Sequence, residues 1–167
     1  MTMKNLRNYT AVVEFLHVGS GPDIEEIRRL FTEYGRSLNF NLCFQSFEEE
    51  LRDLPGAYAQ PRGRLMLARV DGSAAGCVAL KPLDGLVCEM KRLYVRPQFR
   101  GRHLGRALTS RVIDEARAEA YRSVRLDTIA GAMDPAIALY RSMSFREIPA
   151  YYGNPVPGAL YFELALK

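Results

Sequence analysis

One stretch limits the possible folds of this chain more than any other: RLYVRPQFRGRHLGRALTSRVIDEA, residues 92–116. It begins as an apolar, strand-like run that Pro97 ends, because proline cannot donate to a sheet ladder. A turn rich in arginine and glycine follows, and apolar residues then recur every four positions from Leu104 to Ala116, as in an amphipathic helix. The stretch therefore predicts a strand, a tight turn and a crossover helix.

The turn itself has the features of an anion-binding site. The start of a helix exposes unpaired backbone N–H groups and carries about half a positive charge. Glycines would let the backbone approach a ligand closely, and arginines surround them. Together these features indicate a diphosphate site, and the alternative is a solvated, basic start of a helix. A P-loop and a Rossmann turn are excluded, because neither G-x-x-x-x-G-K-[ST] nor G-x-G-x-x-G occurs there.

The rest of the sequence predicts a single mixed α/β domain over residues 1–167, with a central, mostly antiparallel sheet of six to seven strands and about four helices. The expected strands cover residues 9–18, 64–70, 74–80, 87–95, 123–128, 145–150 and 159–166. The expected helices cover residues 23–35, 46–54, 104–116 and 135–143. Asp23 and Asp134 are the expected N-caps, Ser46 and Glu49 form a capping box, and Pro82 to Gly85 is a turn.

The composition favours a cytoplasmic protein that handles a small anionic molecule. Lys plus Arg is 23 and Asp plus Glu is 19, so the net charge is 23 − 19 = +4, which is too small an excess to argue for nucleic acid. No apolar run approaches the ~20 residues of a membrane span, and the N-terminus lacks a signal-peptide core. Cys43, Cys77 and Cys88 have no C-x-x-C spacing, which indicates free thiols and no metal site.

At this point R-G-R-H-L-G resembles the acetyl-CoA loop of the GNAT superfamily of N-acetyltransferases, whose pattern is [RQ]-x-x-G-x-[GA]. Arg100 and Gly105 match the pattern, and His103 stands where it has glycine. Histidine tolerates a positive φ better than most residues, so the exchange need not abolish binding.

A second stretch supports the same resemblance. AIALYRSMSF, residues 136–145, is similar to the family's A-x-x-L-Y-x-x-x-G-F, with Ser144 in place of its glycine. Met133 stands where many members have asparagine. The two motifs occur in the family's order, and the resemblance covers residues 9 to 166.

The resemblance implies acetyl-CoA as co-substrate. In this family a bulge separates one strand from its neighbour, and the pantetheine arm pairs with the freed backbone. A break in alternation at Lys91-Arg92 fits such a bulge. The implied cofactor-binding residues are Leu93, Tyr94, Val95, Arg100, Gly101, Arg102, His103, Leu104, Gly105 and Arg106.

The resemblance also implies two catalytic side chains. Acetyl transfer needs a neutral amine, although free alkylamines are protonated at pH 7, and it needs a proton for the leaving thiolate. Glu89 is the expected base, and its alternative role is a surface strand carboxylate paired with Lys91 or Arg92. Tyr140 is the expected acid, and its alternative role is a packed helix tyrosine.

The acceptor is expected to be a small primary amine, such as an amino acid or a related metabolite. The family builds its acceptor pocket from the first two helices and the last loop, which here are rich in aromatic and amide side chains. The candidate residues are Tyr34, Arg36, Phe44 and Asn154, with Arg36 as the partner of a substrate carboxylate. The alternatives are a non-catalytic acetyl-CoA-binding module and the acetylation of a protein amine. Dimers are common in the family, which leaves a homodimer open.

Overall fold

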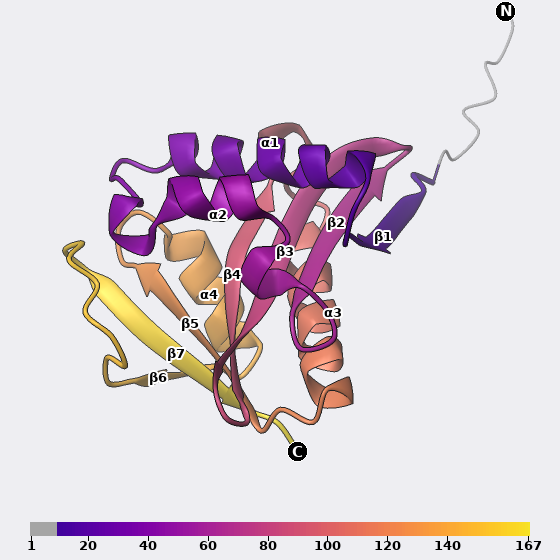
Figure 1. Ribbon diagram of the computed structural model, residues 1–167. Helices are drawn as coiled ribbons and strands as arrows, with labels where there is room; N and C mark the ends of the chain where they lie inside the picture. The colour runs from indigo at the N-terminus through magenta and orange to yellow at the C-terminus, as the bar shows by residue number, and fades with distance from the viewer. Residues whose placement is uncertain (1–9) are drawn as a thin grey trace, which may run out of the picture.

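The computed structural model describes residues 10–167 and has the predicted order of elements (Figure 1). Tyr9, the first residue of the expected first strand, lies outside the described residues. In chain order the helices and strands are β1 (Val13–His17), α1 (Pro22–Ser37), α2 (Phe47–Asp53), β2 (Arg64–Val70), β3 (Ser73–Asp84), β4 (Val87–Val95), α3 (Leu104–Ala118), β5 (Ser123–Ile129), α4 (Asp134–Ser142), β6 (Arg146–Ile148) and β7 (Ala159–Ala165).

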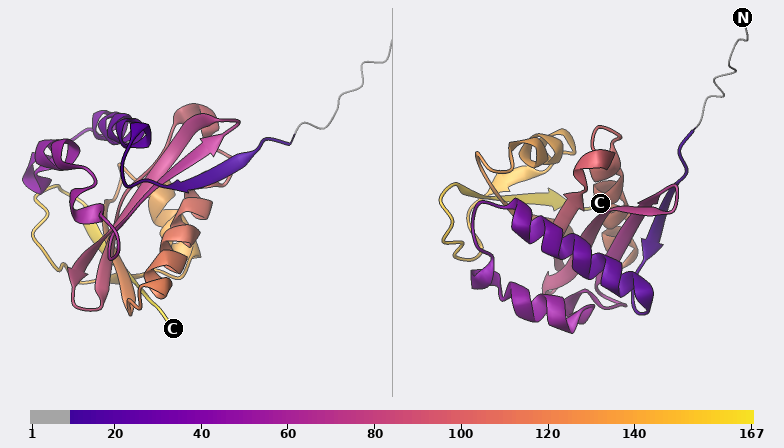
Figure 2. Two further views of the ribbon diagram at one scale, coloured as in Figure 1. Left: turned by 45° about the vertical axis from the view of Figure 1, so that its right-hand side comes forward. Right: turned by 90° about the horizontal axis from the view of Figure 1, so that it is seen from above.

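The strands of the described chain form one seven-stranded sheet in the order β1-β2-β3-β4-β5-β7-β6. Neighbouring strands are antiparallel except β4 and β5, which α3 connects as a crossover helix. Helices α1 and α2 cover one face of the sheet and α3 and α4 cover the other (Figure 2), and each face has its own apolar cluster. The predicted mixed, mostly antiparallel sheet with about four helices is confirmed.

The middle of the sheet opens where β4 and β5 diverge. Their pairing covers Val87–Glu89 against Ser123–Arg125 and then stops. Just beyond, a bulge interrupts β4: Cys77 lies opposite Tyr94 but Ala79 lies opposite Lys91, so between these two pairs β4 has one residue more than β3. Arg92, inside the bulge, has a φ of 58°. The bulge predicted at Lys91-Arg92 and the separated strand pair are both present.

Two predicted N-cap residues, Asp23 and Asp134, are wrong, and Ser46 is the N-cap of α2 as predicted but does not form its capping box. Helix α1 begins at Pro22 after Gly21, which has a φ of 77°, and Asp23 instead accepts a hydrogen bond from Arg69 at 2.6 Å. Ser46 precedes α2 in a left-handed conformation and makes no side-chain cap bond, so the capping box does not form. Asp134 is the first residue of α4 and accepts from the Gly131 N–H at 2.7 Å. Proline in the first turn and local turn geometry decide these ends.

The turn expected at Pro82 to Gly85 is also shorter than predicted. Strand β3 continues through Pro82 to Asp84, and the register between β3 and β4 shifts at this point. Such an irregularity accommodates a residue without an N–H, because the ladder bond at that position is not needed.

All three cysteines are free thiols, as predicted, and two of them are buried. Cys77 and Cys88 are fully buried, and burial raises the pKa of both thiols, that of Cys88 to about 12. A buried thiol with a raised pKa is a poor nucleophile and packs as a small apolar side chain. Within residues 10–167, no helix combines the length and the apolar character that crossing a membrane requires.

Candidate active site

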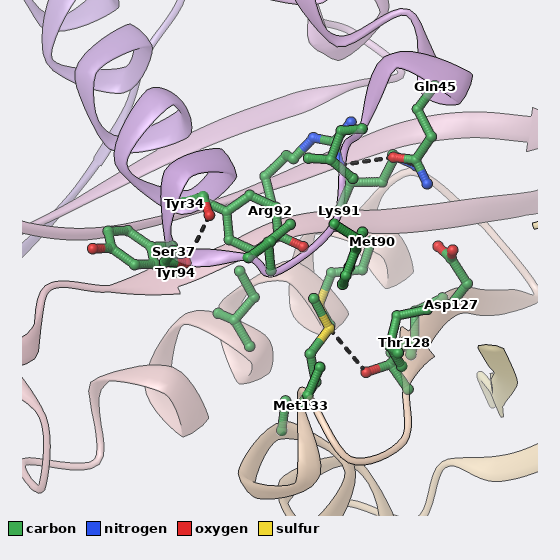
Figure 3. A pocket seen from close by; sticks show the side chains of 18 of the residues that line it. Tyr34, Ser37, Gln45, Met90, Lys91, Arg92, Tyr94, Asp127, Thr128 and Met133 are labelled. Atoms are coloured by element: carbon green, nitrogen blue, oxygen red, sulfur yellow. Dashed lines mark hydrogen bonds between the residues drawn. The ribbon is translucent and has the colours of Figure 1, made fainter. Parts of the chain in front are cut away.

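A cavity of about 330 Å³ lies where β4 and β5 separate (Figure 3). One wall is formed by residues 90–95 of β4 and the other by residues 126–129 of β5. Tyr34 from α1 and Tyr140 from α4 also line it, and these helices lie on opposite faces of the sheet. The cavity is therefore lined by side chains from both faces of the sheet.

One end of the cavity is cationic. Arg100 lines it and donates from Nε to the carbonyl of Val95 at 3.0 Å. The residues that follow lead into α3, whose first hydrogen bond runs from Ala107 to the carbonyl of His103 at 3.0 Å. The N–H groups before Ala107 have no carbonyl within the helix to bind, so they are available to an anion.

His103 is the N-cap of α3 and has a left-handed conformation, with φ 59° and ψ 19°. Ser144 has a φ of 70°. Both residues stand where the family patterns have glycine, and the structure gives the reason: these positions require a positive φ, which glycine adopts without steric cost. Histidine and serine can adopt it at some cost in stability.

The cofactor-binding residues expected from the sequence lie together. Leu93, Tyr94, Val95 and Arg100 line the cavity. The remaining six, Gly101, Arg102, His103, Leu104, Gly105 and Arg106, follow directly in the chain at the start of α3. Arg106 also donates to the Ser142 hydroxyl at 2.5 Å, which ties the beginning of α3 to α4. The backbone of residues 93–95, the gap beside it and the start of α3 thus follow one another along the chain. This arrangement fits a long, thin molecule that ends in phosphates.

Tyr140 lines the same cavity from α4. It is 7% exposed, and its ring packs against Phe145 and Phe162, with centroids 5.7 and 6.5 Å away. Burial raises the pKa of its hydroxyl, so it keeps its proton at neutral pH. Its two expected roles, packed ring and proton donor, are therefore compatible, because the ring is held while the residue faces the cavity.

Asp127 is the acidic residue that sequence reasoning missed. Among the described residues that line this cavity it is the one carboxylate. Its Oδ2 accepts hydrogen bonds from the hydroxyl of Tyr152 and from Nδ2 of Asn154, the latter at 2.8 Å. In Figure 3 it lies on the same side of the cavity as Gln45. A carboxylate between Leu126 and Thr128 in a buried strand is the signal that could have identified it.

Glu89, the base expected from the sequence, lies outside this cavity. Its side chain is 4% exposed, so the alternative of a surface carboxylate is wrong, and it does not line the cavity between β4 and β5. Its Oε1 is 3.5 Å from Lys91 Nζ and 3.7 Å from Lys81 Nζ, and its Oε2 accepts from the Tyr151 hydroxyl at 2.7 Å. Pairing with Lys91 is confirmed. Glu89 does not pair with Arg92, because Arg92 pairs with Glu50 instead.

Three of the four acceptor candidates line the cavity: Tyr34, Phe44 and Asn154. Burial raises the pKa of Tyr34 to about 12. Arg36 does not line the cavity and is exposed on α1. The cationic residues that reach the acceptor side are instead Lys91 and Arg92, both from the bulge of β4.

Comparison with known proteins agrees with these features. Residues 24–145 match the Acetyltransferase (GNAT) family. The chain is 38% identical over 147 residues to an uncharacterized N-acetyltransferase of Schizosaccharomyces pombe, covering 87% of this chain and 90% of that protein. It is 30% identical over 127 residues to N-acetylaspartate synthetase of Danio rerio, covering 75% of this chain and 45% of that protein.

Solved structures share the fold. An acetyltransferase of the GNAT family from Staphylococcus aureus Mu50 superposes with a TM-score of 0.77 at 19% identity, covering 93% of this chain and all of that chain. The PaiA N-acetyltransferase of Thermoplasma acidophilum, solved in complex with coenzyme A, gives 0.72 at 14% identity, covering 93% and 99% of the two chains.

Proposed function

Since the chain belongs to the GNAT family and is therefore an acetyl-CoA-dependent N-acetyltransferase, we propose that its acceptor is the amine of a small molecule. The observation that supports this best is the cavity between β4 and β5. At about 330 Å³ it has the size of a small-ligand site, and aromatic and amide side chains line its acceptor side. A relative named N-acetylaspartate synthetase supports an amino acid or a related metabolite as the acceptor.

Acetyl-CoA would supply the acetyl thioester, and the chain's own residues would hold it. The freed backbone of residues 93–95 is the proposed partner of the pantetheine arm, and the start of α3 with Arg100 is the proposed partner of the phosphates. The exposed start of α3, with left-handed residues at Gly101 and His103, fits such a group because backbone N–H groups carry the binding.

Asp127 is the proposed base. A protonated amine entering the cavity would lose one proton to this carboxylate, directly or through one water molecule. Asp127 fits the task better than Glu89, because it lines the cavity, whereas both oxygens of Glu89 already face two ammonium groups and a tyrosine hydroxyl in another cavity. Asn154 and Tyr152 hold the Asp127 carboxylate in place through its Oδ2.

Tyr140 is the proposed acid. The neutral amine nitrogen forms a bond to the acetyl carbon, and the bond from that carbon to sulfur breaks. The departing thiolate takes a proton from the Tyr140 hydroxyl, and the amine, now an amide, has released its second proton. That second proton passes to the Tyr140 phenolate, directly or through one water molecule, and Asp127 releases its proton to solvent. One protonated amine thus gives one amide, one thiol and one released proton per turnover. No covalent enzyme intermediate is needed, and the buried thiols play no part.

A screen of small amines with acetyl-CoA, read as the release of free thiol, tests the proposal. The panel should contain amino acids, monoamines and polyamines, and a lysine-containing peptide as the protein-amine comparison. We expect one class of small amine to be acetylated with a kcat/KM at least tenfold above that of the peptide. Acetyl-CoA that raises the Tm but releases no thiol with any amine would instead favour a non-catalytic binding module.

A further inference from the structure

A second cavity, of about 490 Å³, lies next to the first on the side of α2. Its walls come from α2 and the turn after it, from β3 and β4, and from Tyr151 and Tyr152 in the loop between β6 and β7. Four residues line both cavities: Phe44, Gln45, Lys91 and Arg92. The two cavities are therefore neighbours that share one wall.

Gln45 is the polar centre of this shared wall. Its Oε1 accepts from Arg92 at 2.8 Å and from Lys91 at 3.3 Å, and its Nε2 donates to the Tyr152 hydroxyl at 3.0 Å. The same hydroxyl donates to Asp127, the proposed base. The shared wall thus connects the second cavity to the site of amine deprotonation through two side chains, Gln45 and Tyr152.

The charges that pair with one another in the second cavity do not balance. Arg92 is matched by Glu50, which accepts from Arg92 Nε at 2.9 Å and lies 2.8 Å from its Nη2. Lys81 and Lys91, in contrast, share a single carboxylate, and both approach the same oxygen of Glu89. Three cations therefore face two carboxylates, which leaves one positive charge in excess.

The excess charge is located at Lys91 and Lys81. The Lys91 side chain is 9% exposed, and burial lowers its pKa although Glu89 opposes that effect. A buried ammonium without a full counter-charge is costly and is stabilised by an added anion. Glu49 and Asp53 also line this cavity, but both are exposed, so water screens their charges.

On the premise of the proposed function, we propose that the second cavity holds an acidic group of the acceptor, a carboxylate, with Lys91 and Lys81 as its cationic partners. The acceptor would then be an amino acid whose amine lies beside Asp127 and whose acidic group lies across the shared wall. This assigns to Lys91 and Lys81 the part that Arg36 was expected to play, and it follows from Lys91 lining both cavities.

Matched pairs of acceptors test the proposal. Aspartate, glutamate, glycine, β-alanine and γ-aminobutyrate are each compared with the primary amide of the same compound, which removes a negative charge at nearly the same size. We expect the wild-type kcat/KM for at least one acid to exceed that of its amide tenfold or more. Lys91→Met should remove most of that preference and Lys81→Met part of it, because the Lys81 side chain is 31% exposed.

Three controls keep the proposal falsifiable. Lys81→Arg should keep the preference, and Lys167→Met, at the exposed C-terminal end, should not change it. The Tm with coenzyme A and each acid, against coenzyme A and its amide, provides a readout that needs no turnover. Acids without an advantage in either rate or Tm would overturn the inference while leaving acetylation of an uncharged amine intact. An equal loss for acids and amides in both lysine variants would also overturn it.

Discussion

Replacement of His103 or Ser144 by glycine should stabilise the protein. Both residues have a positive φ, 59° and 70°, and both are exposed, so no buried contact is lost. The left-handed conformation costs a residue with a Cβ roughly 1–2 kcal/mol. Glycine avoids this cost, but it is more flexible in the unfolded chain, which lowers the free energy of unfolding by about 0.5–1 kcal/mol. The expected net gain is therefore about 0.5–1 kcal/mol for each exchange.

Thermal and denaturant unfolding measure this gain. For a chain of 150–250 residues, about 1 kcal/mol corresponds to a Tm change of roughly 2–4 °C, so each variant should melt about 1–4 °C higher. Ser110→Gly is the matched control. Ser110 is exposed within α3, where glycine is less favourable than serine by about 0.5 kcal/mol, so its Tm should fall. If Ser144→Gly and His103→Gly lowered the Tm as Ser110→Gly does, the argument from backbone conformation would be refuted.

Three further predictions concern the active site. Asp127→Asn should lower kcat by about 10²–10⁴-fold with little change in acetyl-CoA affinity, whereas Glu89→Gln should affect kcat far less; the opposite order in steady-state kinetics would return the role of base to Glu89. Tyr140→Phe should lower kcat by a similar factor while keeping the Tm within a few degrees, because the buried ring remains; an unchanged kcat would exclude the role of acid. Stability should fall above pH ~10, the ordinary tyrosine pKa. Burial in the folded state raises the pKa of Tyr34 to about 12, so the unfolded chain releases that proton first. Tyr34→Phe should therefore reduce the slope of the free energy of unfolding against pH.

Much of the fold was predictable because its signals are local. The apolar stripe from Leu104 to Ala116 predicted α3, and the strand-like runs at 64–70 and 74–80 predicted β2 and β3, since side-chain periodicity reports which face of an element is buried. The helix caps were less predictable. Asp23 and Ser46 have the right chemistry for capping, but Pro22 and the left-handed backbone at Ser46 decide where each helix begins.

The candidate active site was predicted in part. The cofactor side depends on one continuous segment, residues 93–106, so its residues stay together whatever the rest of the fold does. The acceptor side is assembled from α1, the segment before α2, β4, β5 and the loop before β7, and no local pattern says which of their side chains meet. Arg36 was therefore placed in the pocket by its position on α1 although its side chain is exposed on the surface.

The choice between Glu89 and Asp127 separates what the sequence determined from what only the tertiary structure decided. The sequence determined the loop, the order of elements and the position of Tyr140 on a helix, because each depends on neighbouring residues. Glu89 and Leu93 are four residues apart and would share a face of a regular strand. The bulge between them adds one residue to β4, so the side chains after it point to the opposite face from the one that regular alternation predicts. Only the register of β4 against β3 and β5, which is set by contacts between distant segments, places Asp127 in the cavity and Glu89 outside it.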